Sequence, residues 1–190
     1  MPFYDQQDAA KLGFAEIGRD VLISTKASIY RPERISLGDR VRIDDFSFII
    51  GGERGIEIGD NVHIGAFASL CGHGRITMED FSGLAPHCAV YSSSDDYSGR
   101  SLTNPTVGLP YTALHTADIK FGRHVIVGSS SVVLPGVVLE EGCSVGAMSL
   151  VKDSFPPFTM IAGQPAKAIR QRRRDLLAME SEYRAAIASA

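Results

Sequence analysis

Residues 121–151 read FGRHVIVGSSSVVLPGVVLEEGCSVGAMSLV, and a medium-sized apolar residue returns at every sixth position. These residues are Phe121, Val127, Val133, Leu139, Val145 and Val151. Neither the helical period of 3.6 residues nor the strand period of two produces a strict period of six. A six-residue repeat is typical of a parallel β-helix, in which each repeat forms one short strand and one corner. The recurring apolar side chain then points into the coil and stacks on its equivalent one coil above.

The same phase continues upstream of residue 121 with short interruptions. Apolar residues recur in triplets with a spacing of six, and the spacing grows to eight or nine between triplets, as from Ile29 to Leu37. Three strands complete one turn of a triangular prism, so these insertions should all fall at one corner. The triplets are Ile17-Ile23-Ile29, Leu37-Ile43-Ile49, Ile58-Ile64-Leu70 and Met78-Leu84-Val90. The sequence therefore predicts an all-β chain, with a parallel β-helix of about six coils over residues 16–153.

Both ends of the chain depart from the repeat. Residues 1–15 are expected to cap the first coil, with a short helix around Asp8 to Leu12. Residues 154–190 are expected to form a C-terminal extension, and the apolar residues of 173–188 lie roughly on one face of an α-helix.

One interruption is much longer than the others. The strand starts Val90 and Phe121 should be consecutive, but the polar, turn-rich segment 91–118 separates them. Long loops in compact domains are usually functional. We therefore expect this inserted loop to take part in the activity.

Two segments near the C-terminus indicate the protein family that the repeat resembles. VGAMSLVKD at 145–153 and IAGQPAKAIR at 161–170 look like the closing motifs of the galactoside and maltose acetyltransferase branch of the hexapeptide-repeat acyltransferases. With Leu84-Ala85-Pro86, the resemblance covers roughly residues 55–172. It implies a left-handed parallel β-helix, a homotrimer with active sites between subunits, and acetyl-CoA as co-substrate.

The resemblance also implies where acetyl-CoA binds. The pantetheine arm would lie along the prism against exposed backbone at Ser129, Gly146 and Ala147. Small side chains allow such a close approach. The cations carried over for the phosphates are Lys152, Lys167 and Arg170. The chain departs from the family here, because Val151 runs directly into Lys152 where Thr-Lys is common.

The expected catalytic position departs further from the pattern of that family. Attack on a thioester needs a proton acceptor, and the sugar O-acetyltransferases place a histidine at the start of the long loop. The resemblance puts Asp95 at that position, with Asp96 beside it. An amine needs to lose only one proton, and a carboxylate can hold the ammonium. The loop pattern SDDY at 94–97, followed by LTNP at 102–105, resembles nucleotide-amino-sugar N-acetyltransferases of bacterial surface polysaccharide (O-antigen) pathways. We expect N-acetylation of a nucleotide-linked amino sugar, with O-acetylation of a sugar as the alternative.

Two histidines are further candidates for the catalytic group. His115, on the returning limb of the loop, could swing over Asp95 and act as a base supported by a carboxylate. His87 lies one turn before the loop, at an outward position that approaches the acceptor pocket in the family. His63 and His124 occupy outward positions of their repeats, so a surface location is expected for both.

The composition of the chain argues against several other classes of function. A formal net charge of −3 argues against nucleic-acid binding through a global field. No apolar run approaches the roughly 20 residues that span a bilayer, and the first residues lack a signal-peptide pattern. Cys71, Cys88 and Cys143 have no metal-ligand spacing, and the last two occupy the small fifth position of a repeat. We expect buried core cysteines in a cytoplasmic protein without a metal.

One alternative function belongs to a different class of protein. A β-helix scaffold or a metal-dependent, carbonic-anhydrase-like protein shares the fold. The second would need three outward histidines, drawn from His63, His87, His115 and His124, to converge between subunits.

Overall fold

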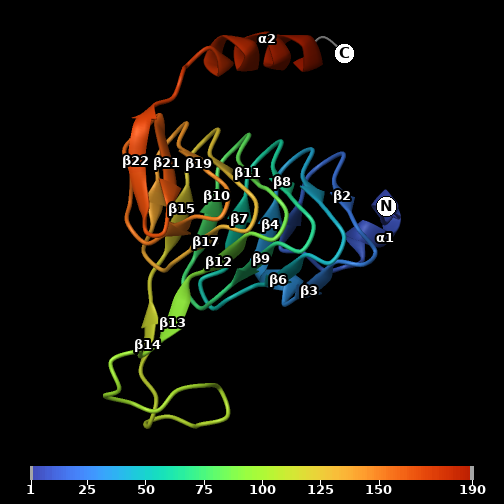
Figure 1. The fold of residues 1–190 in the computed structure, drawn as a ribbon. Coiled ribbons are helices and arrows are strands. Elements are labelled where there is room, and N and C mark those ends of the chain that lie inside the picture. The colour runs from blue at the N-terminus through green and yellow to red at the C-terminus, as the bar shows by residue number, and fades with distance from the viewer. Residues whose placement is uncertain (1, 189–190) are drawn as a thin grey trace.

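The structure, a computed structural model, describes residues 2–188 and is a triangular prism of stacked coils (Figure 1). Each side of the prism is a β-sheet whose neighbouring strands come from successive coils. Sheet 1 contains β1 (Glu16–Ile17), β4 (Ile35–Leu37), β7 (Ile56–Ile58), β10 (Ile76–Met78), β15 (Ile119–Phe121) and β18 (Val138–Leu139). Sheet 2 contains β2 (Leu22–Ile23), β5 (Arg42–Ile43), β8 (His63–Ile64), β11 (Gly83–Leu84), β16 (Ile126–Val127), β19 (Ser144–Val145), β21 (Thr159–Gly163) and β22 (Ala166–Gln171). Sheet 3 contains β3 (Ser28–Tyr30), β6 (Phe48–Ile50), β9 (Ser69–Cys71), β12 (Ala89–Tyr91), β17 (Val132–Val133) and β20 (Leu150–Val151).

The strand register confirms the predicted six-residue phase. In sheet 2, Ile23 aligns with Ile43, and the alignment continues through every later coil. The aligned residues, namely Ile23, Ile43, Ile64, Leu84, Val127, Val145 and Ile161, are all buried. The core of the protein is therefore a set of apolar columns inside the prism, and Cys88 and Cys143 are buried beside them as expected.

The coil count differs from the prediction of about six. Sheet 2 holds seven parallel strands, because β21 pairs in parallel with β19 and starts a further turn beyond residue 153. β22 then folds back antiparallel to β21 at the end of the sheet. A shortened repeat hid this turn: Phe155 takes the place beside Leu139 in sheet 1 only four residues after Val151, so Ile161 follows Val151 by ten residues and not by twelve.

The two ends carry helices close to the expected positions. α1 (Gln6–Ala10) is capped by Asp5, whose side chain accepts a hydrogen bond from the Asp8 amide at 2.8 Å. α2 (Leu176–Ala188) begins later than the predicted residue 173. The delay has a physical cause: Arg172 is held against the prism by hydrogen bonds from its guanidinium to the carbonyls of His124 and Gly142.

α2 lies along the corner between sheets 1 and 2, at the top of Figure 1. Its Tyr183 hydroxyl donates to Asn61 Oδ1 at 2.9 Å, and its Arg184 pairs with Asp80 at 2.8 Å. Its Glu180 is buried and lies 2.6 Å from His124 Nε2. The expected surface position of His124 is therefore wrong: the ring does face outward from the coil, but α2 covers it and leaves it 9% exposed.

Glu180 also receives hydrogen bonds from Arg123 and Arg184, at 3.1 and 2.7 Å. Burial opposes its ionisation, but the hydrogen bonds from Arg184 and His124 outweigh burial and hold the pKa of Glu180 below its usual value. With the contacts of Tyr183 and Arg184, this carboxylate fastens α2 to the prism.

We expect Glu180→Ala to lower the free energy of unfolding by about 2 kcal/mol, because it removes the buried carboxylate shared by Arg123, His124 and Arg184. Urea unfolding measures the loss, and hydrogen exchange should show reduced protection of α2. Glu182→Ala, an exposed glutamate on the same helix, is the matched control. Equal effects of the two substitutions would contradict this role for Glu180.

Candidate active site

A two-stranded arm leaves the prism at the corner between sheets 3 and 1 (Figure 1). β13 (Ser93–Asp95) and β14 (Leu114–Thr116) pair antiparallel, and Ser94 lies opposite His115 while Asp95 lies opposite Leu114. Successive side chains of a strand alternate between its two faces. Asp95 and His115 therefore face opposite sides of the arm, and the structure does not bring them together as the sequence suggested.

Asp96 has a structural function in the arm that its sequence position did not reveal. Its carboxylate accepts hydrogen bonds from the amides of Ser98, Arg100 and Ser101, at 2.8, 3.1 and 3.1 Å, and from the Ser101 hydroxyl. These bonds, first of all those from Ser98, lower the pKa of Asp96 to about 2. Asp96 holds the tip of the arm, whereas the neighbouring Asp95 side chain is exposed and receives no hydrogen bond within residues 2–188.

His87 lies at a different corner, between sheets 2 and 3. Its imidazole stacks on Phe67, with ring centroids 4.8 Å apart and planes 2° apart, and Phe67 stacks in turn on Phe46 at 5.0 Å. All three residues have positive φ at equivalent positions of successive coils. β12 runs between this corner and the arm, so within one chain His87 and Asp95 lie at opposite margins of sheet 3.

Sequence reasoning did not single out the aromatic ladder, although a signal was present. Phe46 and Phe67 are 21 residues apart, as are the aligned core residues Ile43 and Ile64. Both phenylalanine rings are half exposed, at 50% each. The stacked rings give this corner an exposed apolar stripe.

The residues predicted to contact the pantetheine arm lie further along the corner of His87. The amide N–H groups of Ser129 and Ala147 donate no hydrogen bond within residues 2–188. Gly146 has a different function: a Cβ there would lie 2.8 Å from the Ala162 Cβ, and its carbonyl accepts from Ser149 Oγ at 2.6 Å. Coil-on-coil packing is sufficient to explain Gly146, whereas the free amides suit an extended ligand.

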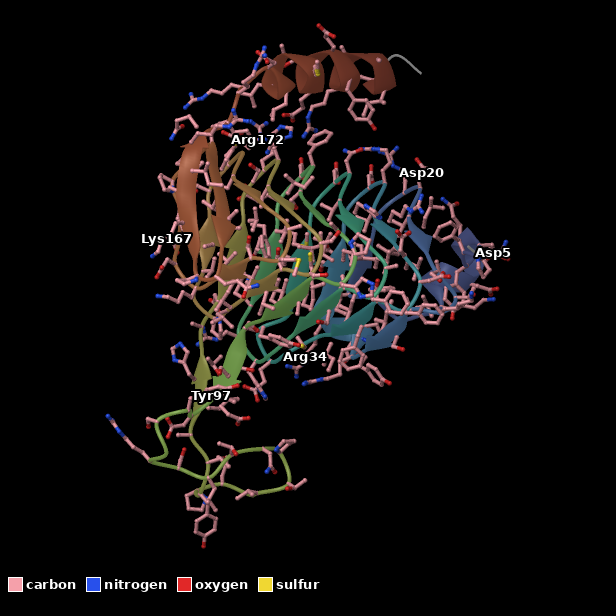
Figure 2. All side chains as sticks on the ribbon, in the orientation of Figure 1. Asp5, Asp20, Arg34, Tyr97, Lys167 and Arg172 are labelled. Atoms are coloured by element: carbon pink, nitrogen blue, oxygen red, sulfur yellow. The ribbon has the colours of Figure 1, made fainter. Side chains whose placement is uncertain are left out.

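The predicted phosphate-binding cations gather at the C-terminal end of the prism, and Figure 2 shows Lys167 there. Lys152 and Lys167 both flank Asp153, at 3.4 and 3.8 Å. Arg170, on β22 opposite Met160, has no ion pair within residues 2–188. Arg170 is therefore the cation most available to a phosphate.

Two of the histidines considered for a shared metal already have carboxylate partners within the chain. His63 is paired with Asp44 at 2.8 Å, and His124 lies under α2. Across residues 2–188, no group of three or more His, Cys, Asp or Glu side chains is placed to hold a metal ion. In the same part of the chain, no helix is both long and apolar enough to cross a membrane.

A hexapeptide prism with an inserted arm, and with free corner amides at Ser129 and Ala147, is the architecture expected of a hexapeptide-repeat acyltransferase. No family model matches the chain. It is 41% identical to the dTDP-4-amino-4,6-dideoxy-D-glucose acyltransferase of Escherichia coli, over 97% of this chain and 96% of that protein. The chain therefore belongs to this family of nucleotide-amino-sugar acyltransferases, and it is an acyltransferase.

Solved structures agree with this assignment. AntD, an N-acyltransferase from Bacillus cereus crystallised with dTDP and 3-hydroxybutyryl-CoA, has a TM-score of 0.92 and 39% identity, with 97% of each chain covered. A maltose O-acetyltransferase from Clostridium difficile 630 has a TM-score of 0.53 and 18% identity, covering 89% of this chain and 75% of that one, and shows the common fold alone. A putative lipopolysaccharide biosynthesis O-acetyl transferase of E. coli K12 is 27% identical over 84% of this chain and 88% of that protein.

We expect Asp96→Ala to speed amide exchange at Ser98, Arg100 and Ser101, measured by NMR, and Asp95→Ala to leave exchange at these amides unchanged. The folded pKa lies below the unfolded value of roughly 3.9, so the carboxylate orders the tip fully above about pH 5. This order should be lost as the pH falls toward 2. Faster exchange in the Asp95 variant would contradict the division of roles.

Proposed function

We propose that this enzyme transfers the acetyl group of acetyl-CoA to the amine of a dTDP-linked 4-amino-4,6-dideoxy sugar. The acceptor class is taken from the E. coli relative and from AntD, which has also been crystallised with dTDP-4-amino-4,6-dideoxyglucose and coenzyme A. The observation that carries the proposal is the unpaired carboxylate of Asp95 on the arm. AntD holds 3-hydroxybutyryl-CoA in one structure, which makes a longer acyl donor the second candidate.

The chemistry follows from the charge of an amine. At neutral pH the sugar amine arrives as an ammonium, and the Asp95 carboxylate can accept its hydrogen bonds and take up its first proton, which then passes to solvent. The neutral amine then attacks the thioester carbonyl, a C–N bond forms, and the C–S bond breaks to release the CoA thiolate. A free corner amide, at Ser129 or Ala147, would donate to the oxyanion of the tetrahedral intermediate. The amine proton finally leaves to the thiolate or to solvent.

A single chain cannot bring these groups together. The corner amides lie between sheets 2 and 3, whereas the arm leaves from the other margin of sheet 3. Figure 2 shows Tyr97 on the arm well away from Lys167 at the end of the prism, and Tyr97 is 94% exposed. In a homotrimer, the arm of one subunit can reach the corner of the next. The exposed stack of Phe46 and Phe67 supports subunit packing along that corner.

The cellular setting is also part of the proposal. The acceptor is a nucleotide sugar, and the relative at 27% identity is named for lipopolysaccharide biosynthesis. We place the enzyme in the cytoplasm, in the synthesis of a surface polysaccharide such as O-antigen. Its co-substrate is acetyl-CoA, and its reaction requires neither nucleic acid nor metal.

The first test of function is release of free CoA thiol during incubation with acetyl-CoA and a panel of dTDP-linked sugars. The 4-amino sugar should turn over, and its 4-hydroxy analogue should not. Asp95→Asn should lower kcat/KM for the amino sugar by roughly 10²–10³-fold, because the ammonium loses its counter-charge. The Kd for CoA should not change.

Glu182→Gln on α2 is the matched control and should keep full activity. Parallel substitutions His115→Ala and His87→Ala separate the alternative bases: a loss of roughly 10²–10⁴-fold in kcat for either would assign base catalysis to that histidine. Full turnover of the Asp95 variant would contradict the proposed function of its carboxylate.

The shared site has its own test. Asp95→Asn inactivates the arm, and a double variant, Lys167→Glu with Arg170→Glu, should abolish CoA binding. When the two are co-expressed, random trimers with intersubunit sites should recover about a quarter of wild-type activity, because each site needs one intact arm and one intact corner. Light scattering should give three chain masses. A monomer with full activity, or no recovery in mixed trimers, would rule out sites between subunits.

A further inference from the structure

The Gly146 carbonyl accepts hydrogen bonds from two serine hydroxyls. Ser149 Oγ donates to it at 2.6 Å, and Ser131 Oγ donates to it at 3.2 Å. Both serine side chains are buried in the corner between sheets 2 and 3. The carbonyl belongs to the same peptide unit as the amide of Ala147, which donates no hydrogen bond within residues 2–188. Two buried donors therefore lie behind one free amide.

This arrangement fixes the direction of the free amide. The peptide unit between Gly146 and Ala147 is trans, so its C=O and N–H groups point in opposite directions. Ser131 and Ser149 hold the carbonyl toward the buried side of the corner. The N–H group is thereby turned toward the other side, where Ala147 is exposed.

Two backbone amides determine where the hydroxyl hydrogens point. The Gly163 amide donates to Ser149 Oγ at 3.2 Å, and the Ser149 amide donates to Ser131 Oγ at 3.1 Å. Each hydroxyl therefore accepts a hydrogen bond from an amide and donates its own hydrogen to the Gly146 carbonyl. Hydrogen bonds in such a chain polarise one another, so the N–H group of Ala147 becomes a stronger donor.

The network also joins the two closing motifs of the sequence. Ser149 lies in the segment 145–153, and Gly163 lies in the segment 161–170. Their hydrogen bond ties the hairpin of β21 and β22 to the corner that carries the Ala147 amide. The end of the prism thus supports a predicted contact with CoA through buried groups.

The equivalent position of other coils provides a structural comparison. The equivalent residues of five successive coils are all buried, namely Ser47, Ala68, Cys88, Ser131 and Ser149. Ser47 repeats the arrangement of Ser131, because its Oγ donates to the Gly65 carbonyl of the next coil at 3.2 Å. Its coil precedes the arm, whereas the predicted CoA contacts belong to later coils. Ser47 is therefore a matched control, and Ala68 shows that alanine fits this position.

We propose that Ser131 and Ser149 are positioning residues for acetyl-CoA, because they orient the Ala147 amide toward a carbonyl of the pantetheine arm and strengthen it as a donor. Neither serine touches the ligand. The inference rests on the proposed function and identifies the buried groups that prepare its cofactor-binding corner.

Isothermal titration with CoA measures this effect without catalysis. Ser131→Ala and Ser149→Ala should each raise the Kd for CoA roughly fivefold, because the Gly146 carbonyl loses one of its two donors. Ser47→Ala removes an equivalent buried hydrogen bond and should change the Kd less than about twofold, because distant sites act independently. Urea unfolding should show similar losses of stability for Ser47→Ala and Ser131→Ala.

A truncated ligand separates positioning from a general distortion of the prism. Adenosine 3′,5′-bisphosphate carries the nucleotide of CoA but no pantetheine arm. Its Kd should be the same for the wild type, Ser131→Ala and Ser149→Ala. Ser149→Cys should bind CoA more tightly than Ser149→Ala, since the Cys88 thiol donates from the equivalent position to the Gly128 carbonyl at 3.2 Å.

Wild-type affinity for CoA in both alanine variants would overturn the inference, as would equal losses of affinity for CoA and for the truncated ligand. The two proposals fail in different ways. If the alanine variants lose CoA affinity as expected but the wild type acetylates no amino sugar, the proposed function alone is refuted. If the wild type turns over the amino sugar and Ser131→Ala and Ser149→Ala bind CoA normally, the positioning role alone is refuted.

Discussion

Coil-on-coil stacking is the constraint on which every other feature depends. A strand of two or three residues cannot bury its apolar side chain alone, so each coil is stable only against its neighbours. The alignment of Ile23 with Ile43 and Ile64 fixes the register of three coils at once, and the later coils repeat it. A one-residue slip would expose a whole column of the core, so the register is strongly specified. Each corner residue is thereby held at a fixed height along the prism.

That fixed height distributes the functional groups along one axis. The arm leaves the prism after β12, and the free amides of Ser129 and Ala147 belong to the coils that follow. The cations Lys167 and Arg170 lie at the end of the prism. In the proposed enzyme, CoA would extend from that end toward the arm, where the acceptor amine would meet it.

The sequence predicted most of the fold because the repeat is a physical periodicity. The buried column that contains Ile23, Leu84 and Val145 follows from spacing alone. The features that the sequence could not predict depend on contacts between residues that are far apart in the chain. The seventh coil was hidden by the shortened repeat between Val151 and Phe155, and the burial of His124 required knowing that α2 returns over that corner. Spacing identifies an outward residue but does not reveal what covers it.

The candidate site was less predictable for a related reason. Asp95 and Asp96 are adjacent residues of the same type. Asp95 is nevertheless exposed, whereas Asp96 accepts four hydrogen bonds from the tip of the arm. Only the pairing of β13 with β14 shows that His115 faces the opposite side from Asp95. These facts depend on local backbone geometry, which the repeat does not fix, because the arm lies outside the prism.

The separation of Asp95 from His115 also bears on the choice of acceptor. A hydroxyl loses its proton as it attacks, and an imidazole held by a carboxylate is a common way to assist that loss. The arm of a single chain does not assemble such a pair. A lone carboxylate is a weak base toward a hydroxyl, but it attracts an ammonium and needs no partner to do so. The exposed Asp95 is therefore better matched to an amine than to an alcohol, and the identity of the chain's relatives agrees with the geometry of its own arm.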